Sequence, residues 1–262
     1  MIKFAKAHAY GNDFLYVDKG DVRDVPIAPV AREMCDRHAG IGADGLILYA
    51  TTDDGATMRL LNADGGRAEV SGNGLRGLAA LLLRNVQPIG AEVTIQTDAG
   101  NKRLVRTDRS ASRQTFRAGM GRPSDIRQVS IPTPDESLAA VVLSMGNPQC
   151  VVLGALPSED RFRRLGAALE HHAMFPEGTN VEFAHVEAPD RVRILIWERG
   201  CGPTLSSGTG SCAALVATAS YGGALRHAEV IAPGGPQRVE WLDDGVYLTG
   251  WAEVICEGVW LR

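Results

Sequence analysis

The sequence predicts an α+β protein made of two similar halves. Two related glycine-rich segments, Ser71-Gly72-Asn73-Gly74 and Ser207-Gly208-Thr209-Gly210, are each followed by an apolar run, and they start 136 residues apart (71 to 207). Three further pairs recur in the same order at offsets of 134 to 136 residues: Gly11-Asn12 with Gly146-Asn147, Gly42-Ala43-Asp44 with Gly178-Thr179-Asn180, and Met58–Leu61 with Val192–Leu195. A period this long excludes a solenoid and fits a duplicated domain.

Strand-like alternation is frequent in both halves, whereas helical periodicity is rare. The strands predicted in the first half are Ile2–Phe4, Phe14–Val17, Gly45–Tyr49, Met58–Leu61, Glu92–Thr97 and Lys102–Arg106. Those predicted in the second half are Ala139–Leu143, Cys150–Leu153, Val192–Trp197, Arg238–Leu242 and Val246–Thr249. The predicted helices are Ala28–Asp36, Gly74–Arg84, Ser158–His171 and Gly210–Ala219.

The repeat sets the expected domain limits. We expect residues 1–115 to form the N-terminal half and residues 116–251 the C-terminal half. The C-terminal strand, 252–262, is expected to return to the first half. No GxGxxG follows a predicted strand, which argues against a dinucleotide-binding sheet or an oxidoreductase of that type.

Composition narrows the class of protein. The chain has 262 residues, of which 45% are apolar and 22% charged, as in a globular protein. A net charge of −4 gives no electrostatic reason to expect a nucleic-acid partner. The longest apolar helical run, Gly77 to Leu83, is too short to span a membrane, and Met1–Lys6 lacks the apolar stretch of a signal peptide. We therefore expect a cytoplasmic protein with no membrane partner.

The cysteines give no sign of a metal site. Their spacing contains no CxxC pair and no histidine-flanked ligand pattern, and their odd number does not suggest a disulfide framework. We expect them to be mostly buried free thiols. They are Cys35, Cys150, Cys201, Cys212 and Cys256.

The two glycine-rich segments are the best candidates for a binding site. Glycine lets the backbone approach a ligand closely, and the first amides of a helix, together with its dipole, attract an anion such as a carboxylate. A serine at such a helix start is also an ordinary N-cap, which is the simpler interpretation of one such segment. Two related segments in a duplicated chain favour a site in which Ser71 and Ser207 face one ligand from opposite sides. A two-base racemase needs that geometry, with one group removing the α-proton and the other returning a proton.

Other polar residues lie where such a site would need them. Asn62 and Glu198-Arg199 each follow a predicted strand, whereas Asn12, Asn147 and Asn180 lie in turns. Asparagine is common in turns for structural reasons alone, and Glu198-Arg199 could be a surface ion pair. The position of this pair between an apolar strand and the second glycine-rich segment favours ligand binding.

Taken together, these segments resemble the diaminopimelate epimerase family over nearly the whole chain. Gly11–Phe14 is similar to its GNDF motif, Arg37–Gly45 to RHxGIGxDG, and Asn62–Gly65 and Gly72–Arg76 to NADG and GNGxR. The similar segments of the second half are Gly146–Pro148, Pro176–Phe183 and Glu198–Gly200 leading to Gly208–Gly210.

The resemblance implies two pseudo-symmetric domains, each a β-sheet or barrel wrapped around a central helix, with the active site in the cleft between them. It implies an isomerase that interconverts LL- and meso-diaminopimelate in lysine and peptidoglycan synthesis, with no pyridoxal phosphate, other cofactor or metal. The expected binding partner is a small-molecule amino-acid substrate. Because the family often forms dimers, the resemblance also leaves a homodimer open. The substrate contacts that it implies are Asn12, Asn62, Gly72, Asn73, Asn147, Asn180, Glu198, Arg199, Gly208 and Thr209.

The chain departs from the family at the two catalytic positions. Ser71 and Ser207 stand where the family has cysteines, Gln149 replaces a histidine, and Pro203 replaces a frequent glutamate. A thiol near a helix start ionises near neutrality, whereas a serine hydroxyl needs an adjacent base. Cys212 matches a family cysteine inside the helix, which we interpret as a core residue.

We interpret the chain as an epimerase in which Ser71 and Ser207 occupy the acid/base positions. The serines could be engineered replacements, although Gln149 and Pro203 differ as well; they could be native and active; or they could mark a relative that binds an amino acid without epimerising it. A racemase of another amino acid, or a dehydratase of the wider proline-racemase-like superfamily, is the enzymatic alternative.

Overall fold

The computed structural model describes residues 1–23, 25–68, 71–98, 100–133 and 136–261. The chain divides into two compact units: unit 1 is Met1–Ala118 with Gly250–Arg262, and unit 2 is Gly119–Thr249. Arg262, at the end of the expected returning strand, lies outside the described residues. The mixed α+β class expected from the sequence is confirmed.

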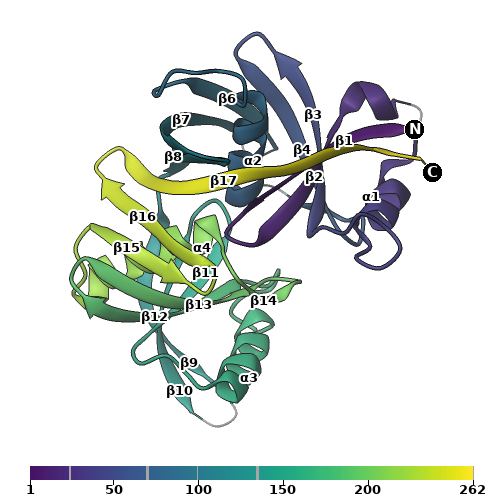
Figure 1. The fold of residues 1–262 in the computed structure, drawn as a ribbon. Coiled ribbons are helices and arrows are strands. Elements are labelled where there is room, and N and C mark those ends of the chain that lie inside the picture. Colours follow the sequence, from purple (N-terminus) through teal and green to yellow (C-terminus); the bar gives the residue numbers. More distant parts are fainter. Residues whose placement is uncertain (24, 69–70, 99, 134–135, 262) are drawn as a thin grey trace. The chain divides into compact units, whose positions relative to one another are not determined.

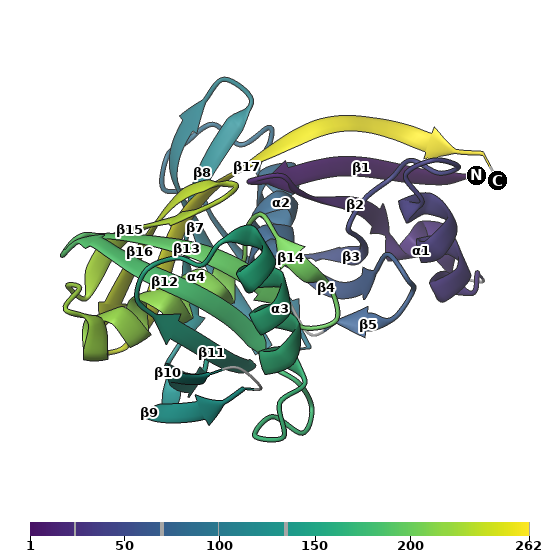
Figure 2. The same ribbon diagram turned by 90° about the horizontal axis from the view of Figure 1, so that it is seen from below.

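Unit 1 is a ring of strands (Figure 1). β2–β3 and β4–β6 are parallel pairs, the short β5 (Arg67–Ala68) pairs with β4, and β8 pairs with β17, which closes the ring. The ring follows the order β17 (Gly245–Trp260), β1 (Ile2–Ala9), β2 (Asn12–Asp18), β3 (Gly45–Thr52), β4 (Gly55–Asn62), β6 (Glu92–Thr97), β7 (Gly100–Ser110) and β8 (Arg113–Gly121). The register Ile2↔Trp260 brings the two ends of the chain together, as Figure 2 shows.

Helix α2 (Gly72–Leu82) packs against β1 and β2 in unit 1. Nine consecutive residues, 72–80, are buried, so the helix has no solvent face and is apolar nearly all round. Glycine is required at Gly77, because a Cβ there would lie 2.0 Å from the Tyr16 hydroxyl. That hydroxyl donates a hydrogen bond to the Gly74 carbonyl at 3.0 Å, which ties β2 to the first turn of the helix.

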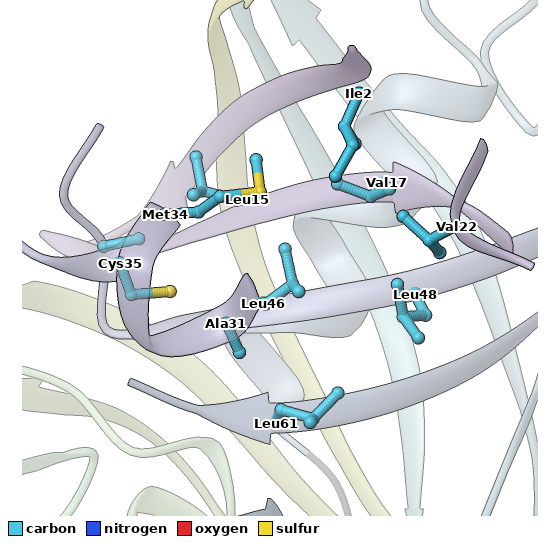
Figure 3. Close-up of a cluster of buried hydrophobic side chains, with 11 residues drawn as sticks. Ile2, Leu15, Val17, Val22, Ala31, Met34, Cys35, Leu46, Leu48 and Leu61 are labelled. Atoms are coloured by element: carbon cyan, nitrogen blue, oxygen red, sulfur yellow. The ribbon is translucent and has the colours of Figure 1, made fainter. Parts of the chain in front are cut away.

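The outer face of these strands is covered by α1 (Ile27–Cys35), which follows the short 3-10 helix η1 (Lys19–Val22). Figure 3 shows Ala31, Met34 and Cys35 of α1 directed toward Leu15 and Leu46 of the sheet. Strand β2 is therefore buried on both faces, with Leu15 and Val17 toward α1 and Phe14 and Tyr16 toward α2.

Unit 2 repeats this element order. Here β11–β12 and β13–β15 are parallel, as their equivalents are in unit 1, and the short β14 (Gly202–Thr204) pairs with β13. The sheet runs in the order β9 (Ser124–Pro132), β10 (Ser137–Ser144), β11 (Pro148–Leu153), β12 (Asn180–Ala188), β13 (Arg191–Glu198), β15 (His227–Ala232), β16 (Gly235–Leu242) and β17.

Two helices sandwich this second sheet. α4 (Gly208–Ala217), continued by the π-helical turn η2 (Thr218–Gly222), is buried nearly all round and packs against strands from β10 to β16. α3 (Glu159–Glu170) is amphipathic and buries Phe162, Leu165 and Leu169 against the other face. Strand β12 is therefore covered on both sides: Val181 and Phe183 belong to the α3 cluster, and the alternate residues face α4.

The predicted helices are confirmed as α1 to α4, and each predicted strand overlaps an observed one. The sequence patterns did not identify β8, β9, β12 or β15, nor the short β5 and β14.

Candidate functional site

Ser71 lies at the start of α2 with extended backbone angles, φ −121° and ψ 123°. Its Oγ accepts a hydrogen bond from the Gly74 amide at 3.1 Å, which is the geometry of an N-cap. The side chain is partly exposed. The hydroxyl oxygen thus lies at the positive end of a buried helix dipole, where a negative charge is stabilised.

Two predicted contact residues meet beside Ser71. Asn73, which is buried, donates through Nδ2 to Asn12 Oδ1 at 3.0 Å, and Asn12 Nδ2 donates to Asp44 Oδ2 at 2.7 Å. Arg76, one turn along α2, donates to Asn73 Oδ1. The start of α2 and the loop before β3 are therefore joined by side-chain amides.

A charged cluster fixes this loop. Arg37 bridges Asp13 and Asp44 at 2.7 Å each, and Lys6 lies 2.9 Å from Asp13. Burial raises the pKa of Asp13, but hydrogen bonds from Arg37 and Lys6 outweigh burial, so the net shift of this pKa is downward. The charged cluster holds Asp13, and with it Asn12, in place.

Asn62 ends β4 opposite Gly45 in the register, and its carbonyl accepts from the Gly65 amide at 2.9 Å in a turn. Within the part of the chain that the structure describes, its side chain shares no hydrogen bond with Asn12 or Asn73. Gly72 is the buried first residue of α2.

Ser207 has the same role at the start of α4. Its Oγ accepts from the Gly210 amide at 3.2 Å, and its carbonyl accepts from Ser211 Oγ at 2.7 Å. The Gln237 amide donates to Ser206 Oγ and Ser211 Oγ, both at 3.2 Å. In contrast to Ser71, Ser207 is buried, with 5% of its surface exposed.

The predicted contacts of the second half also gather at a helix start. Asn147 Nδ2 lies 3.5 Å from Thr209 Oγ1, at the limit of a hydrogen bond, next to the buried Gly208. Asn180 accepts from the Arg199 amide at 3.1 Å and donates to the Pro148 carbonyl at 3.1 Å. The amides of Asn147 and Asn180 therefore converge on the segment that begins β11.

Glu198 is the last residue of β13, and Arg199 lies in the turn that follows. Glu198 pairs with Gly202 across the turn into β14, and the Arg199 guanidinium donates to the Glu177 carbonyl at 3.1 Å. The buried carboxylate of Glu170 positions this turn, because it accepts hydrogen bonds from Trp197 Nε1 at 2.6 Å and from the Gly200 amide at 2.7 Å.

Sequence reasoning missed Glu182, which is completely buried in β12. A Cβ placed on Gly210 would lie 2.5 Å from Glu182 Oε1, so this carboxyl group lies against the first turn of α4. Burial, and secondarily the charge of Glu198, raise the pKa of Glu182 well above its ordinary value. The available signal was a charged residue inside the otherwise apolar run Val181–Ala184, on the face opposite Val181 and Phe183.

Across the described ranges, no three His, Cys, Asp or Glu side chains gather into a metal-binding group. None of the helices in those ranges has both the length and the apolar character needed to cross a membrane.

The fold places the chain in a class of solved structures that share its architecture over nearly their whole length. A hydroxyproline epimerase from Agrobacterium vitis matches with a TM-score of 0.72 at 17% identity, covering 98% of this chain and 91% of that one. This likeness concerns the fold alone.

Within that class, the chain belongs to the diaminopimelate epimerase family, whose model matches residues 4–124 and 141–255. A diaminopimelate epimerase from Desulforudis audaxviator is 38% identical over 284 aligned residues that cover 100% of both chains. Another, from Synechococcus elongatus, is 36% identical and covers 98% of this chain and 97% of its own.

Proposed function

We propose that this protein is a cofactor-independent epimerase that interconverts LL- and meso-diaminopimelate, with Ser71 and Ser207 as its two acid/base groups. One observation carries the proposal: in a chain of the diaminopimelate epimerase family, each half has a serine hydroxyl at the start of a buried helix, and an asparagine from outside the helix contacts a side chain of its first turn.

The helix starts support the acid/base role. Each serine Oγ accepts a backbone N–H, and each lies at the positive end of a helix dipole. Both effects stabilise negative charge on oxygen. A serine hydroxyl still needs a neighbouring base to accept its proton, so the surroundings of each serine decide how well it works.

The asparagines and helix amides supply the binding groups in this proposal. The backbone amides at Gly72-Asn73 and Gly208-Thr209 hold the carboxylate at the reacting carbon, as helix starts hold anions. The remaining polar contacts to the substrate come from Asn12, Asn62, Asn147, Asn180, Glu198 and Arg199.

The same proposal places the reaction in the cytoplasm. The free cysteines Cys35, Cys150, Cys201, Cys212 and Cys256 fit a reducing compartment. Whether the active form is a homodimer would be decided by sedimentation velocity.

The test is deuterium incorporation at the α-carbon of LL- and meso-diaminopimelate in D₂O, for the native protein and for the S71C/S207C variant. Exchange and interconversion by the native protein support the proposal in full. Exchange by the Cys/Cys variant alone keeps the substrate assignment and removes the acid/base role of the hydroxyls. Exchange by neither variant overturns the proposal and favours an amino-acid-binding protein or another substrate.

A further inference from the structure

The carboxyl group of Glu182 lies close to Ser207. Glu182 Oε1 and Ser207 Cβ lie 2.5 Å and 3.2 Å from the point that a Cβ on Gly210 would occupy, so they are no farther apart than the sum of these distances. The room for the carboxyl group exists only because residue 210 is glycine. The Ser207 hydroxyl is thus near enough to the carboxyl group for a proton to pass between them through one water molecule.

Gln149 connects Glu182 to the predicted substrate contacts. One end of its side-chain amide lies 3.1 Å and 3.2 Å from the two Glu182 oxygens, and the other end lies 2.7 Å from Asn147 Oδ1 and 3.3 Å from Asn147 Nδ2. An ionised Glu182 accepts hydrogen bonds from the Gln149 nitrogen, whereas a protonated Glu182 donates to the Gln149 oxygen. Both protonation states therefore find a hydrogen-bond partner, which a proton-exchanging group requires.

The surroundings favour a carboxyl group that can change its charge. Burial and Glu198 of β13 raise the pKa of Glu182, and Cys150 of β11, whose own pKa is raised by burial and by Glu182, adds no positive charge. α4 contributes no charged side chain, and its buried Cys212 is its only thiol. The positive end of the α4 dipole at Gly210 offsets part of the cost of ionisation.

We propose that Glu182 is the proton acceptor behind Ser207, acting through the Ser207 hydroxyl rather than on the substrate. The inference rests on the proposed epimerase function. As Ser207 Oγ takes the α-proton, the Cα–H bond breaks and its electron pair stays on the carbon, while the original hydroxyl proton passes to a Glu182 oxygen. In the reverse direction Glu182 returns a proton to Ser207 Oγ, which protonates the carbon; no other reactant is needed.

The test compares E182Q in two backgrounds, native and S207C, by initial rates of α-deuterium exchange. With serine at 207, E182Q lowers kcat/KM about a hundredfold, the range of general acid–base catalysis. With cysteine at 207 it lowers kcat/KM less than about threefold, because a thiolate forms without the carboxylate. The matched control is E187Q on the same strand, an exposed glutamate paired with Arg193, which leaves both rates unchanged.

The pH profile separates this role from a structural one. The kcat/KM of the native protein rises with pH as Glu182 ionises, and this rising part of the pH profile is absent in E182Q. An equal loss in both backgrounds, or a limb that survives E182Q in a variant whose circular dichroism and thermal midpoint match the native protein, overturns the inference. Absence of exchange by the native protein overturns it as well, whereas the proposed substrate is judged separately by the S71C/S207C variant.

Discussion

The first turns of α2 and α4 differ in the side chains that lie behind them. A Cβ on Gly74 would meet Ile47 Cδ1 at 2.7 Å and Phe14 at 3.7 Å, whereas a Cβ on Gly210 would meet the Glu182 carboxyl group. At the equivalent place unit 1 presents two apolar side chains, and unit 2 presents a buried carboxyl group with Gln149 behind it. The caps themselves match, at 3.1 Å and 3.2 Å.

This comparison indicates that the duplicated halves keep their backbone and diverge in the chemistry behind the serine. Among the described residues, the apolar side chains of Phe14 and Ile47 lie behind Ser71, whose Oγ has the Gly74 amide and the helix dipole to stabilise negative charge, whereas Ser207 also has a carboxyl group nearby. In the acid/base role that we propose for them, the two serines are therefore unequal, and the asymmetry can be tested by exchanging their surroundings.

The largest effect is expected from I47E, which puts a carboxyl group at the unit 1 position that corresponds to Glu182. Ile47 is fully buried, and Phe14 offers the new carboxyl group no hydrogen bond. The variant should lose about 3–5 kcal/mol of unfolding free energy, as expected for an unpartnered buried acid. Urea unfolding at pH 7 followed by circular dichroism measures the change.

The control for I47E is the double variant F14Q/I47E, which copies the Gln149–Glu182 pair into unit 1. Relative to the summed losses of the F14Q and I47E single variants, it should regain about 1.5–3 kcal/mol, the usual value of hydrogen bonds to a charged group. A loss of unfolding free energy below about 1 kcal/mol for I47E, or no recovery in the double variant, would contradict the difference that we infer between the side chains behind the two serines.

The next effect concerns the serines themselves. S71C should raise the α-deuterium exchange rate about a hundredfold, because a thiolate replaces a hydroxyl behind which the described part of the chain places apolar side chains instead of a carboxyl group. S207C should raise the rate less than about tenfold, because in our proposal Glu182 already assists Ser207. Initial rates with LL- and meso-diaminopimelate give both numbers, and a larger gain from S207C contradicts the asymmetry.

Much of the fold follows from local patterns. The 136-residue repeat and the two buried helices could be predicted from the sequence. Ser71 and Ser207 are the N-caps of α2 and α4, and both helices are apolar nearly all round. Strand β9 was missed because it is mostly exposed and shows no apolar alternation. Strand β8 was missed because its buried face includes the polar Gln114.

Part of the candidate site could be predicted from the sequence. The pairs Asn12–Asn73 and Asn147–Thr209 join residues that the sequence had already singled out. Glu182 was not found, because a charged residue in a strand normally faces solvent, and only the helices on both faces of β12 force it inward. Such a contact depends on tertiary packing, which local periodicity does not contain.

The smallest effect is a pH-dependent difference in stability between the native protein and E182Q. Because burial raises the pKa of Glu182, the folded state keeps this proton at pH values where the unfolded chain has released it. The folded state then binds more protons than the unfolded state, so the contribution of Glu182 to stability is present at low pH and is lost as pH rises. E182Q lacks this pH-dependent contribution to stability.

Urea unfolding of both proteins between pH 5 and pH 9 measures the difference. The unfolding free energy of the native protein should fall relative to that of E182Q by at most about 1.4 kcal/mol per pH unit, the limit for one proton. E187Q should run parallel to the native protein above pH 6, because Arg193 lowers the pKa of Glu187 and keeps it ionised there. If the stability curves of E182Q and the native protein run parallel, the pKa of Glu182 is not raised by folding. The two helix starts would then differ in packing and not in the ionisation of a carboxyl group.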